Sequence, residues 1–138
     1  MSPVRVLLAG PNNYRWRAYR ETLDAVGFSA QHTSNGMDCV ALLRAFQPNV
    51  LVLDPNIPWG GGDGVLAVRD EEPGLNQNLV IILTAGCDSS LLYRMSDYAI
   101  DDLVWQPISG FDLKRRLERL LNFQREVITG LEVVNIPD

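Results

Sequence analysis

Asp54, Thr84 and Gln106 each directly follow an apolar run of the sequence. They supply a carboxylate, a hydroxyl and a side-chain amide, which can exchange hydrogen bonds or, through their oxygens, bind a hard cation such as Mg²⁺. These groups can act together only if the fold brings the ends of the apolar runs to one place. The pattern of the rest of the chain therefore decides whether they form a site.

That pattern predicts an α/β fold. Five short runs read as strands, most of them apolar without alternation as is typical of strands covered on both faces, and segments with helical spacing alternate with them. The alternation predicts a doubly wound five-stranded parallel sheet of order 2-1-3-4-5, the flavodoxin-like arrangement, with a crevice beyond the carboxyl ends of its strands. The strands are expected at 4–9, 28–32, 49–53, 79–83 and 103–105, and the helices near 16–26, 34–46, 65–70, 88–95 and 109–120.

Length and composition narrow the function classes. The 138 residues suit one domain, and a net charge of −5 lacks the basic excess of duplex nucleic-acid binders, so we expect no nucleic acid partner. The apolar runs are too short to span a membrane. Cys39 and Cys87 form no CxxC pair, and the N-terminus shows no signal-peptide pattern, so a reducing cytoplasm is the simplest location.

The residues at the predicted strand ends resemble those of the receiver domain of two-component response regulators. The resemblance covers about residues 4–121 and depends on a set of motifs in a fixed order. These are Asp54 with Asn56-Ile57-Pro58, then Asp63-Gly64, then Thr84-Ala85, and finally Pro107. It implies that Asp54 is the phosphoacceptor and that the Thr84 hydroxyl contacts the phosphoryl group. It also implies a Mg²⁺ site that includes Asp54 and Asn56.

The chain departs from the family at positions that carry the chemistry. Gly10 and Pro11 stand where the family has an acidic pair that holds Mg²⁺, and Gln106 stands at the usual Lys position. Leu103 replaces the aromatic switch residue, and the loop after Asp54 is longer than usual. Phosphoryl transfer depends on charge neutralisation, so we expect weak Mg²⁺ binding and slow or absent phosphorylation. We also expect Gln106-Pro107 to be cis, as the matching bond is in the family.

Several residues also allow simpler interpretations. Asp54 could merely cap the turn that follows its strand. The glycine run 60–62 is followed by no Lys-Ser/Thr, so it reads as a flexible linker and not as a phosphate loop. His32 and Cys39 read as structural. Arg15, Arg17 and Arg20 are expected on a solvated helix face, with the alternative that Arg15 or Arg17 leans toward Asp54.

The end of the chain suggests an extension. We divide the chain into a receiver domain at 1–122 and a helical extension or tail at 123–138. The spacing of Leu113, Leu117, Leu120, Gln124, Val127 and Leu131 is heptad-like. It favours either simple packing of the last helix or contact with a partner protomer or output module. We expect a weak homodimer through this helix or through the face with Tyr93, Met95 and Trp105, and we expect Trp59 and Trp105 to flank the crevice.

Together these patterns predict a regulatory interaction module, not an enzyme. A sensor histidine kinase or phosphotransfer protein and a downstream output domain or protein are the partners that the resemblance implies. One alternative is a pseudo-receiver that never carries phosphate. Another is a flavodoxin-like cofactor-binding protein, which is less favoured because no Ser/Thr/Gly-rich phosphate loop follows the first strand.

Overall fold

Strands and helices alternate along the part of the chain that the computed structural model describes, which is residues 2–86 and 88–135, with side chains up to 123. The order is β1 (Arg5–Ala9), α1 (Tyr14–Ala25), β2 (Ser29–Thr33), α2 (Gly36–Ala45), β3 (Val50–Leu53), α3 (Gly61–Glu71), β4 (Leu79–Thr84), α4 (Ser89–Met95), β5 (Asp102–Trp105) and α5 (Gly110–Asn135).

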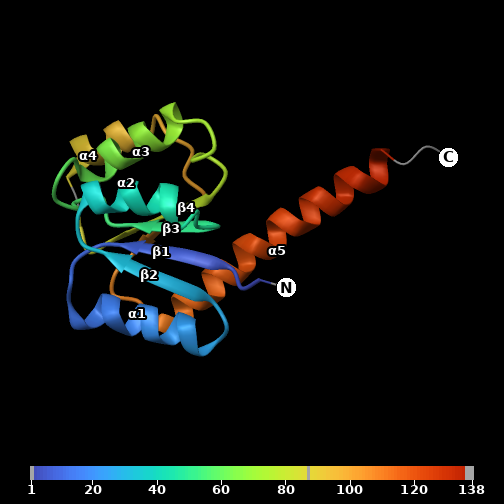
Figure 1. Ribbon diagram of the computed structural model, residues 1–138, viewed down its shortest axis with the longest axis horizontal. Coiled ribbons are helices and arrows are strands. Elements are labelled where there is room, and N and C mark those ends of the chain that lie inside the picture. The colour runs from blue at the N-terminus through green and yellow to red at the C-terminus, as the bar shows by residue number, and fades with distance from the viewer. Residues whose placement is uncertain (1, 87, 136–138) are drawn as a thin grey trace.

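The strands form one parallel sheet of order β2-β1-β3-β4-β5, which confirms the predicted topology. Helices α2, α3 and α4 cover one face and α1 and α5 cover the other (Figure 1). The central strands are buried on both faces, and every residue of β3 is buried. This is why these strands are apolar throughout and do not alternate.

Polar caps fix where several helices begin, because the first backbone N–H groups of a helix have no partner within it. Asn13 caps α1, Asn35 caps α2 and Asp88 caps α4, each accepting backbone N–H groups through its side-chain oxygen. The Ser109 hydroxyl accepts the backbone N–H of Asp112 at 3.1 Å, at the start of α5. Polar side chains therefore cap the first turns of α1, α2, α4 and α5.

The interpretation of the glycine run as a flexible linker is wrong. Gly61 and Gly62 form the first turn of α3, and Gly60 precedes them in a left-handed conformation with φ of 103°. A Cβ on Gly62 would lie 2.8 Å from the Cα of Pro55. Glycine is needed here because the start of α3 packs directly against the backbone of the preceding loop.

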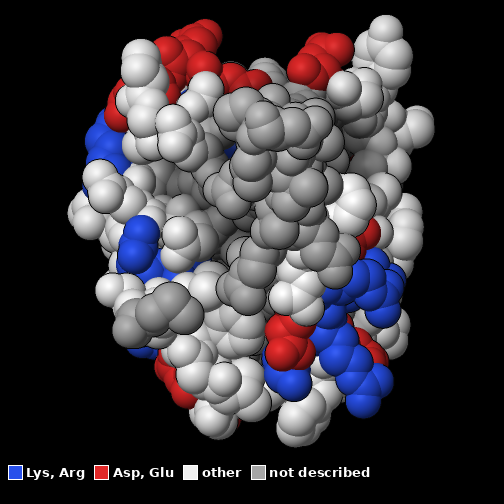
Figure 2. All heavy atoms as spheres, turned by 90° about the vertical axis from the view of Figure 1, so that its right-hand side faces the viewer, with Lys and Arg blue, Asp and Glu red and all other residues white. Residues whose placement is uncertain are grey.

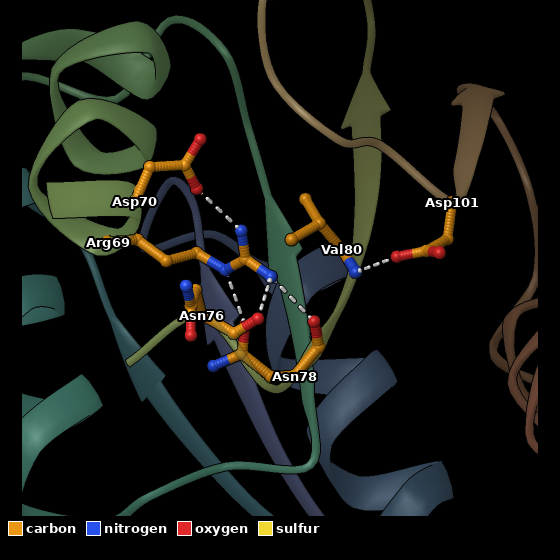
Figure 3. A network of polar contacts seen from close by, with 6 residues as sticks. All are labelled: Arg69, Asp70, Asn76, Asn78, Val80 and Asp101. Atoms are coloured by element: carbon orange, nitrogen blue, oxygen red, sulfur yellow. Dashed lines mark hydrogen bonds and ion pairs between the residues drawn. The ribbon is translucent and has the colours of Figure 1, made fainter. Parts of the chain in front are cut away.

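A buried arginine secures the segment between α3 and β4 (Figure 3). The guanidinium of Arg69 donates to the side-chain oxygen of Asn78 at 2.6 Å and to the backbone carbonyl of Asn78 at 2.7 Å. It also binds the carboxylate of Asp70 and the backbone carbonyl of Asn76. On the other side of β4, Asp101 accepts the backbone N–H of Val80 at 2.7 Å. These bonds fix the start of β4 and hence its position in the sheet.

Helix α5 continues well beyond the core that it covers. Leu113 and Leu117 are fully buried against the sheet, and the helix then runs past the amino ends of the strands (Figure 1). The predicted boundary after residue 122 therefore falls inside one continuous helix. Gln124, Val127 and Leu131 lie outside the residues whose side chains are described. Within the described residues, no helix is long and apolar enough to cross a membrane.

Candidate functional site

The parallel register brings the predicted site residues to one edge of the sheet. Ala9 pairs with Leu53, and the backbone N–H of Asp54 donates to the carbonyl of Ala9 at 2.8 Å. Thr84 is the last residue of β4, and its carbonyl accepts the backbone N–H of Gln106 at 2.7 Å. Asp54, Thr84 and Gln106 therefore lie at the carboxyl ends of three neighbouring strands, which is where open α/β sheets place their binding sites.

Asp54 is half-buried at this edge. One carboxylate oxygen accepts the backbone N–H of Asn56 at 2.8 Å, in a turn typical of Asp side chains. Burial raises the pKa of Asp54 above its usual value, and the hydrogen bond from Asn56 offsets part of that rise. The simpler capping role and a role in chemistry are thus compatible in the same side chain.

Thr84 and Asn56 are both bound to Gly86. The Thr84 hydroxyl is fully buried and accepts the backbone N–H of Gly86 at 3.0 Å. The side-chain amide of Asn56 donates to the carbonyl of Gly86 at 2.8 Å. The loops after β3 and β4 are therefore joined, and the Asn56 side chain is engaged with protein and not directed solely to a ligand.

Gln106 is bound to helix α1. Its side-chain Nε2 donates to the Tyr19 hydroxyl at 2.9 Å, and that hydroxyl donates to the carbonyl of Ile108 at 3.2 Å. The Gln106-Pro107 bond is cis, as predicted. The residue at the usual Lys position is therefore held by a neutral hydrogen bond to α1.

The segment directly after β1, residues 10–13, carries no carboxylate that could bind a metal ion. The carbonyl of Gly10 bonds His32 Nε2 at 2.9 Å, which confirms a structural role for His32. The Asn13 side-chain oxygen accepts the backbone N–H groups of Arg15 and Trp16, both at 3.1 Å, so it caps α1. Pro11 is exposed and offers no side-chain donor.

Sequence reasoning missed Trp16 as a residue of this region. The indole ring is fully buried against Gly10 and meets Tyr19 edge-on, with ring centroids 5.7 Å apart. The sequence predicted Trp16 only as the first residue of the helix expected near 16–26. Its helical spacing with Tyr19 was visible, but the spacing gave no sign that the ring reaches the end of β1.

The carboxylates on neighbouring loops have partners of their own. Asp63 accepts the Nε–H of Arg94 at 3.0 Å, and Asp88 caps α4. Among the described residues, no group of three or more His, Cys, Asp or Glu side chains is placed to hold a metal ion. Arg15 lies over the ring of Tyr14, with its guanidinium carbon 5.9 Å from the ring centroid.

Two other expectations concern surface residues. Trp59 is exposed and lines an apolar groove of about 480 Å³ between α2 and α3, together with Met37 and Val40. Trp105 is exposed on β5. Met95 was expected on the outer face near α4, but it is buried in the core beneath α4, so that expectation is wrong.

Solved structures share this arrangement. A CheY-like response regulator receiver domain protein from Methanospirillum hungatei superposes with a TM-score of 0.79 at 17% identity, covering 91% of this chain and 98% of that one. The chain has the fold of a response regulator receiver domain. A second receiver domain, from a sensor histidine kinase of Pseudomonas aeruginosa, gives a TM-score of 0.77 at 17% identity, covering 87% of this chain and 98% of that one. That protein is described with a magnesium ion coordinated in its active site cleft.

Sequence relatives also point to receiver domains, which confirms the resemblance. The polar-differentiation response regulator DivK of Brucella anthropi is 23% identical over 107 residues, which is 78% of this chain and 87% of DivK. "Probable C4-dicarboxylate response regulator DctR" of Priestia megaterium is 26% identical over 94 residues, or 68% of this chain. That match spans only 40% of DctR. No protein-family model matches the chain.

Proposed function

We propose that this receiver domain is a regulatory interaction module of two-component signalling, with Asp54 as its candidate phosphoacceptor. The observation that carries the proposal is the placement of Asp54, Thr84 and Gln106 at the ends of three adjacent parallel strands. Phosphorylation would proceed by attack of an Asp54 carboxylate oxygen on phosphorus. The bond from phosphorus to the donor's leaving group would break, and an acyl phosphate would form on Asp54.

The surroundings of Asp54 favour slow or absent phosphoryl transfer. Transfer requires neutralisation of the charge on the phosphoryl oxygens, usually by metal ions and cationic side chains. Gln106 is neutral, and its amide is bound to Tyr19. The Thr84 hydroxyl and the second N–H of the Gln106 amide can donate to a phosphoryl oxygen, but neither group carries a positive charge.

A magnesium ion does not fit the donor set of this site. Mg²⁺ requires near-octahedral oxygen ligands and gives up its waters reluctantly. The end of β1 provides Gly10 and Pro11 in place of carboxylates, and the space beside Gly10 is filled by the Trp16 ring. We therefore propose that Mg²⁺ binds weakly, with Asp54 and Asn56 as its candidate ligands.

The partners that we propose are proteins. A sensor histidine kinase or phosphotransfer protein would act on Asp54, and a downstream output domain or protein would read the surface. Exposed Tyr93, Leu103 and Trp105 on α4 and β5 suit a protein contact, including a weak homodimer. We propose a cytoplasmic location and no enzymatic activity of its own.

The charges near α5 support a protein partner over a nucleic acid. Figure 2 shows the largest group of basic residues at the lower right of the end from which α5 projects, a smaller group at the left, and acidic residues mainly along the top. Within α5, Lys114 pairs with Glu118 at 3.0 Å, and Arg116 pairs with Asp102 at 2.8 Å. Paired side chains of this kind leave little uncompensated positive charge for phosphates.

Intact mass spectrometry with a small-molecule phosphodonor and Mg²⁺ tests the role of Asp54. We expect little or no gain of one phosphoryl group, and any gain should disappear in Asp54→Asn. Rapid and complete phosphorylation of Asp54 would show that the site is intact and would contradict the proposed impairment.

A second candidate function is a pseudo-receiver that works without phosphate. The hydrogen bond between Gln106 and Tyr19 favours it, because it satisfies the amide at the usual Lys position without a phosphoryl group. In that case partner binding should be the same for the wild type and Asp54→Asn. A cofactor-binding role is less supported, and the absorbance spectrum of the purified protein would reveal a bound flavin.

A further inference from the structure

Gly10, the first residue after β1, has no room for a side chain. A Cβ at this position would lie within 2.6 Å of three carbon atoms of the Trp16 ring. Carbon atoms that are not bonded pack at about 3.5–4.0 Å, so the ring occupies the volume that a side chain at position 10 would need. Gly10 adjoins Asp54 across the sheet, because the backbone N–H of Asp54 donates to the carbonyl of Ala9.

The Trp16 ring is held firmly in this place. It is fully buried, meets Tyr19 edge-on and lies 6.4 Å from the His32 ring between centroids. Its indole N–H is buried without a hydrogen-bond partner among the described residues. An unpaired buried N–H is unfavourable, so the ring is kept there by the apolar volume that it fills and not by polar bonds.

Tyr19 closes the neighbouring side of the same region. Its hydroxyl accepts from Gln106 and donates to the carbonyl of Ile108. The side chain at the usual Lys position is thereby tied to α1. Two aromatic residues one helical turn apart thus contact two of the positions at which this chain departs from the receiver pattern, Gly10 and Gln106.

We propose that Trp16 and Tyr19 form an aromatic plug that keeps divalent cations from binding beside Asp54. This inference rests on the proposed function in one respect, which is the expected position of the metal ion beside Asp54. A hard cation needs oxygen ligands, and Trp16 presents ring carbons to Gly10 at the end of β1. Restoring carboxylates at positions 10 and 11 is therefore insufficient for metal binding as long as Trp16 is present.

Manganese is a suitable probe, because Mn²⁺ shares the octahedral oxygen preference of Mg²⁺ and its free ion is measured directly by electron paramagnetic resonance. The wild type should show no saturable Mn²⁺ binding in the low millimolar range. The variant G10D/P11D/W16L should bind Mn²⁺ about tenfold or more tightly than either G10D/P11D or W16L alone. Saturable binding by the wild type that is lost in Asp54→Asn would overturn the plug. Equal affinities of G10D/P11D and G10D/P11D/W16L would overturn it as well.

A double-mutant cycle of folding stability tests whether the Trp16 ring blocks a side chain at position 10, even if the multiple variants fold poorly. Gly10→Ala adds only a Cβ and should lower the denaturation midpoint in the wild type. The loss should be smaller in a Trp16→Leu background, where the ring no longer fills the space. Gly64→Ala is the matched control, because a Cβ at Gly64 meets nothing within 4 Å. The same loss in both backgrounds would show that Trp16 is not the obstacle.

The two proposals fail in different ways. A saturable Mn²⁺ site in the wild type would refute the proposal that Trp16 and Tyr19 exclude cations. It would not affect the proposal that the domain is a regulatory receiver. A flavin bound to the purified protein would refute the proposed regulatory function. It would not affect the proposal based on the contact between Gly10 and Trp16.

Discussion

The Nε2 atom of Gln106 lies 2.9 Å from the hydroxyl of Tyr19, across 87 positions of sequence. This bond ties the loop after β5 to helix α1, and the same hydroxyl continues to the carbonyl of Ile108. The residue that would otherwise reach toward an acidic site thus has a partner within the domain.

Removing the Tyr19 hydroxyl should destabilise the domain. Tyr19→Phe leaves the Gln106 amide and the Ile108 carbonyl without their partner in a partly buried place, which costs about 1–2 kcal/mol of unfolding free energy. Tyr14→Phe is the control, because Tyr14 is exposed and should change little. Chemical denaturation measures both, and equal stabilities would show that the bond to Gln106 contributes nothing.

Asp54 should make the domain less stable as the pH rises. Burial raises the pKa of Asp54 in the folded state, so the folded protein binds more protons than the unfolded chain between the ordinary and the raised pKa. The contribution of protonated Asp54 to the free energy of unfolding is complete below the pKa of the unfolded chain. This contribution is lost as the pH rises through the raised pKa of the folded state.

Asp54→Asn should therefore be more stable than the wild type at about pH 7, and the difference should shrink at acidic pH, near the ordinary carboxyl pKa of about 4. Denaturant unfolding of both proteins across this range checks the expectation. A difference that does not vary with pH would show that the Asp54 charge is not the cause.

Replacing the buried Arg69 should cost more than replacing an exposed arginine. Arg69→Met leaves the carbonyls of Asn76 and Asn78 without their charged donor, and we expect a loss of about 2–3 kcal/mol. Arg44→Met breaks only the exposed pair with Glu72 and should have little effect. Comparable losses in the two variants, measured by denaturant unfolding, would refute the structural role of Arg69.

Alanine substitutions should distinguish the glycines of α3. Gly62→Ala forces a Cβ toward the Pro55 backbone and should cost about 1–3 kcal/mol. Gly64→Ala should instead stabilise the protein by roughly 0.5–1 kcal/mol, because alanine favours the helix and has room there. If both substitutions were neutral, the segment would behave as the linker that the sequence suggested.

The Cys39 thiol should react only when the domain unfolds. Burial raises the pKa of Cys39 to about 12, so the thiolate is scarce at neutral pH and the sulfur is covered. A thiol reagent applied to a Cys87→Ser variant should modify Cys39 at a rate that follows unfolding in denaturant. Rapid modification of the native protein would contradict the buried position.

The fold was predictable because its signals are local. The central strands are short and almost entirely apolar runs, and Asn35 and Asp88 are residue types that favour the N-cap position they occupy. Asp54 and Thr84 stood out because each is a polar residue at the end of such a run. Parallel pairing then places them at one edge without further information.

The parts that escaped prediction depend on contacts between distant segments. Nothing near Gln106 in the sequence indicates that its amide binds Tyr19. Trp16 has the spacing of an ordinary core residue, and only the tertiary structure shows that it fills the space beside Gly10. Glycine is a poor helix former, so the start of α3 was read as a loop until packing against Pro55 explained it.

Gly86 serves both loops at the carboxyl edge of the sheet, since its N–H is bound by Thr84 and its carbonyl by Asn56. A displacement of either loop must therefore stretch a bond to this one residue before it can proceed independently. Beyond the pairing of β3 with β4, the two loops are thus linked through a single glycine. The bond between the Asn56 side chain and the Gly86 carbonyl therefore couples a displacement of one loop to the other without a metal ion.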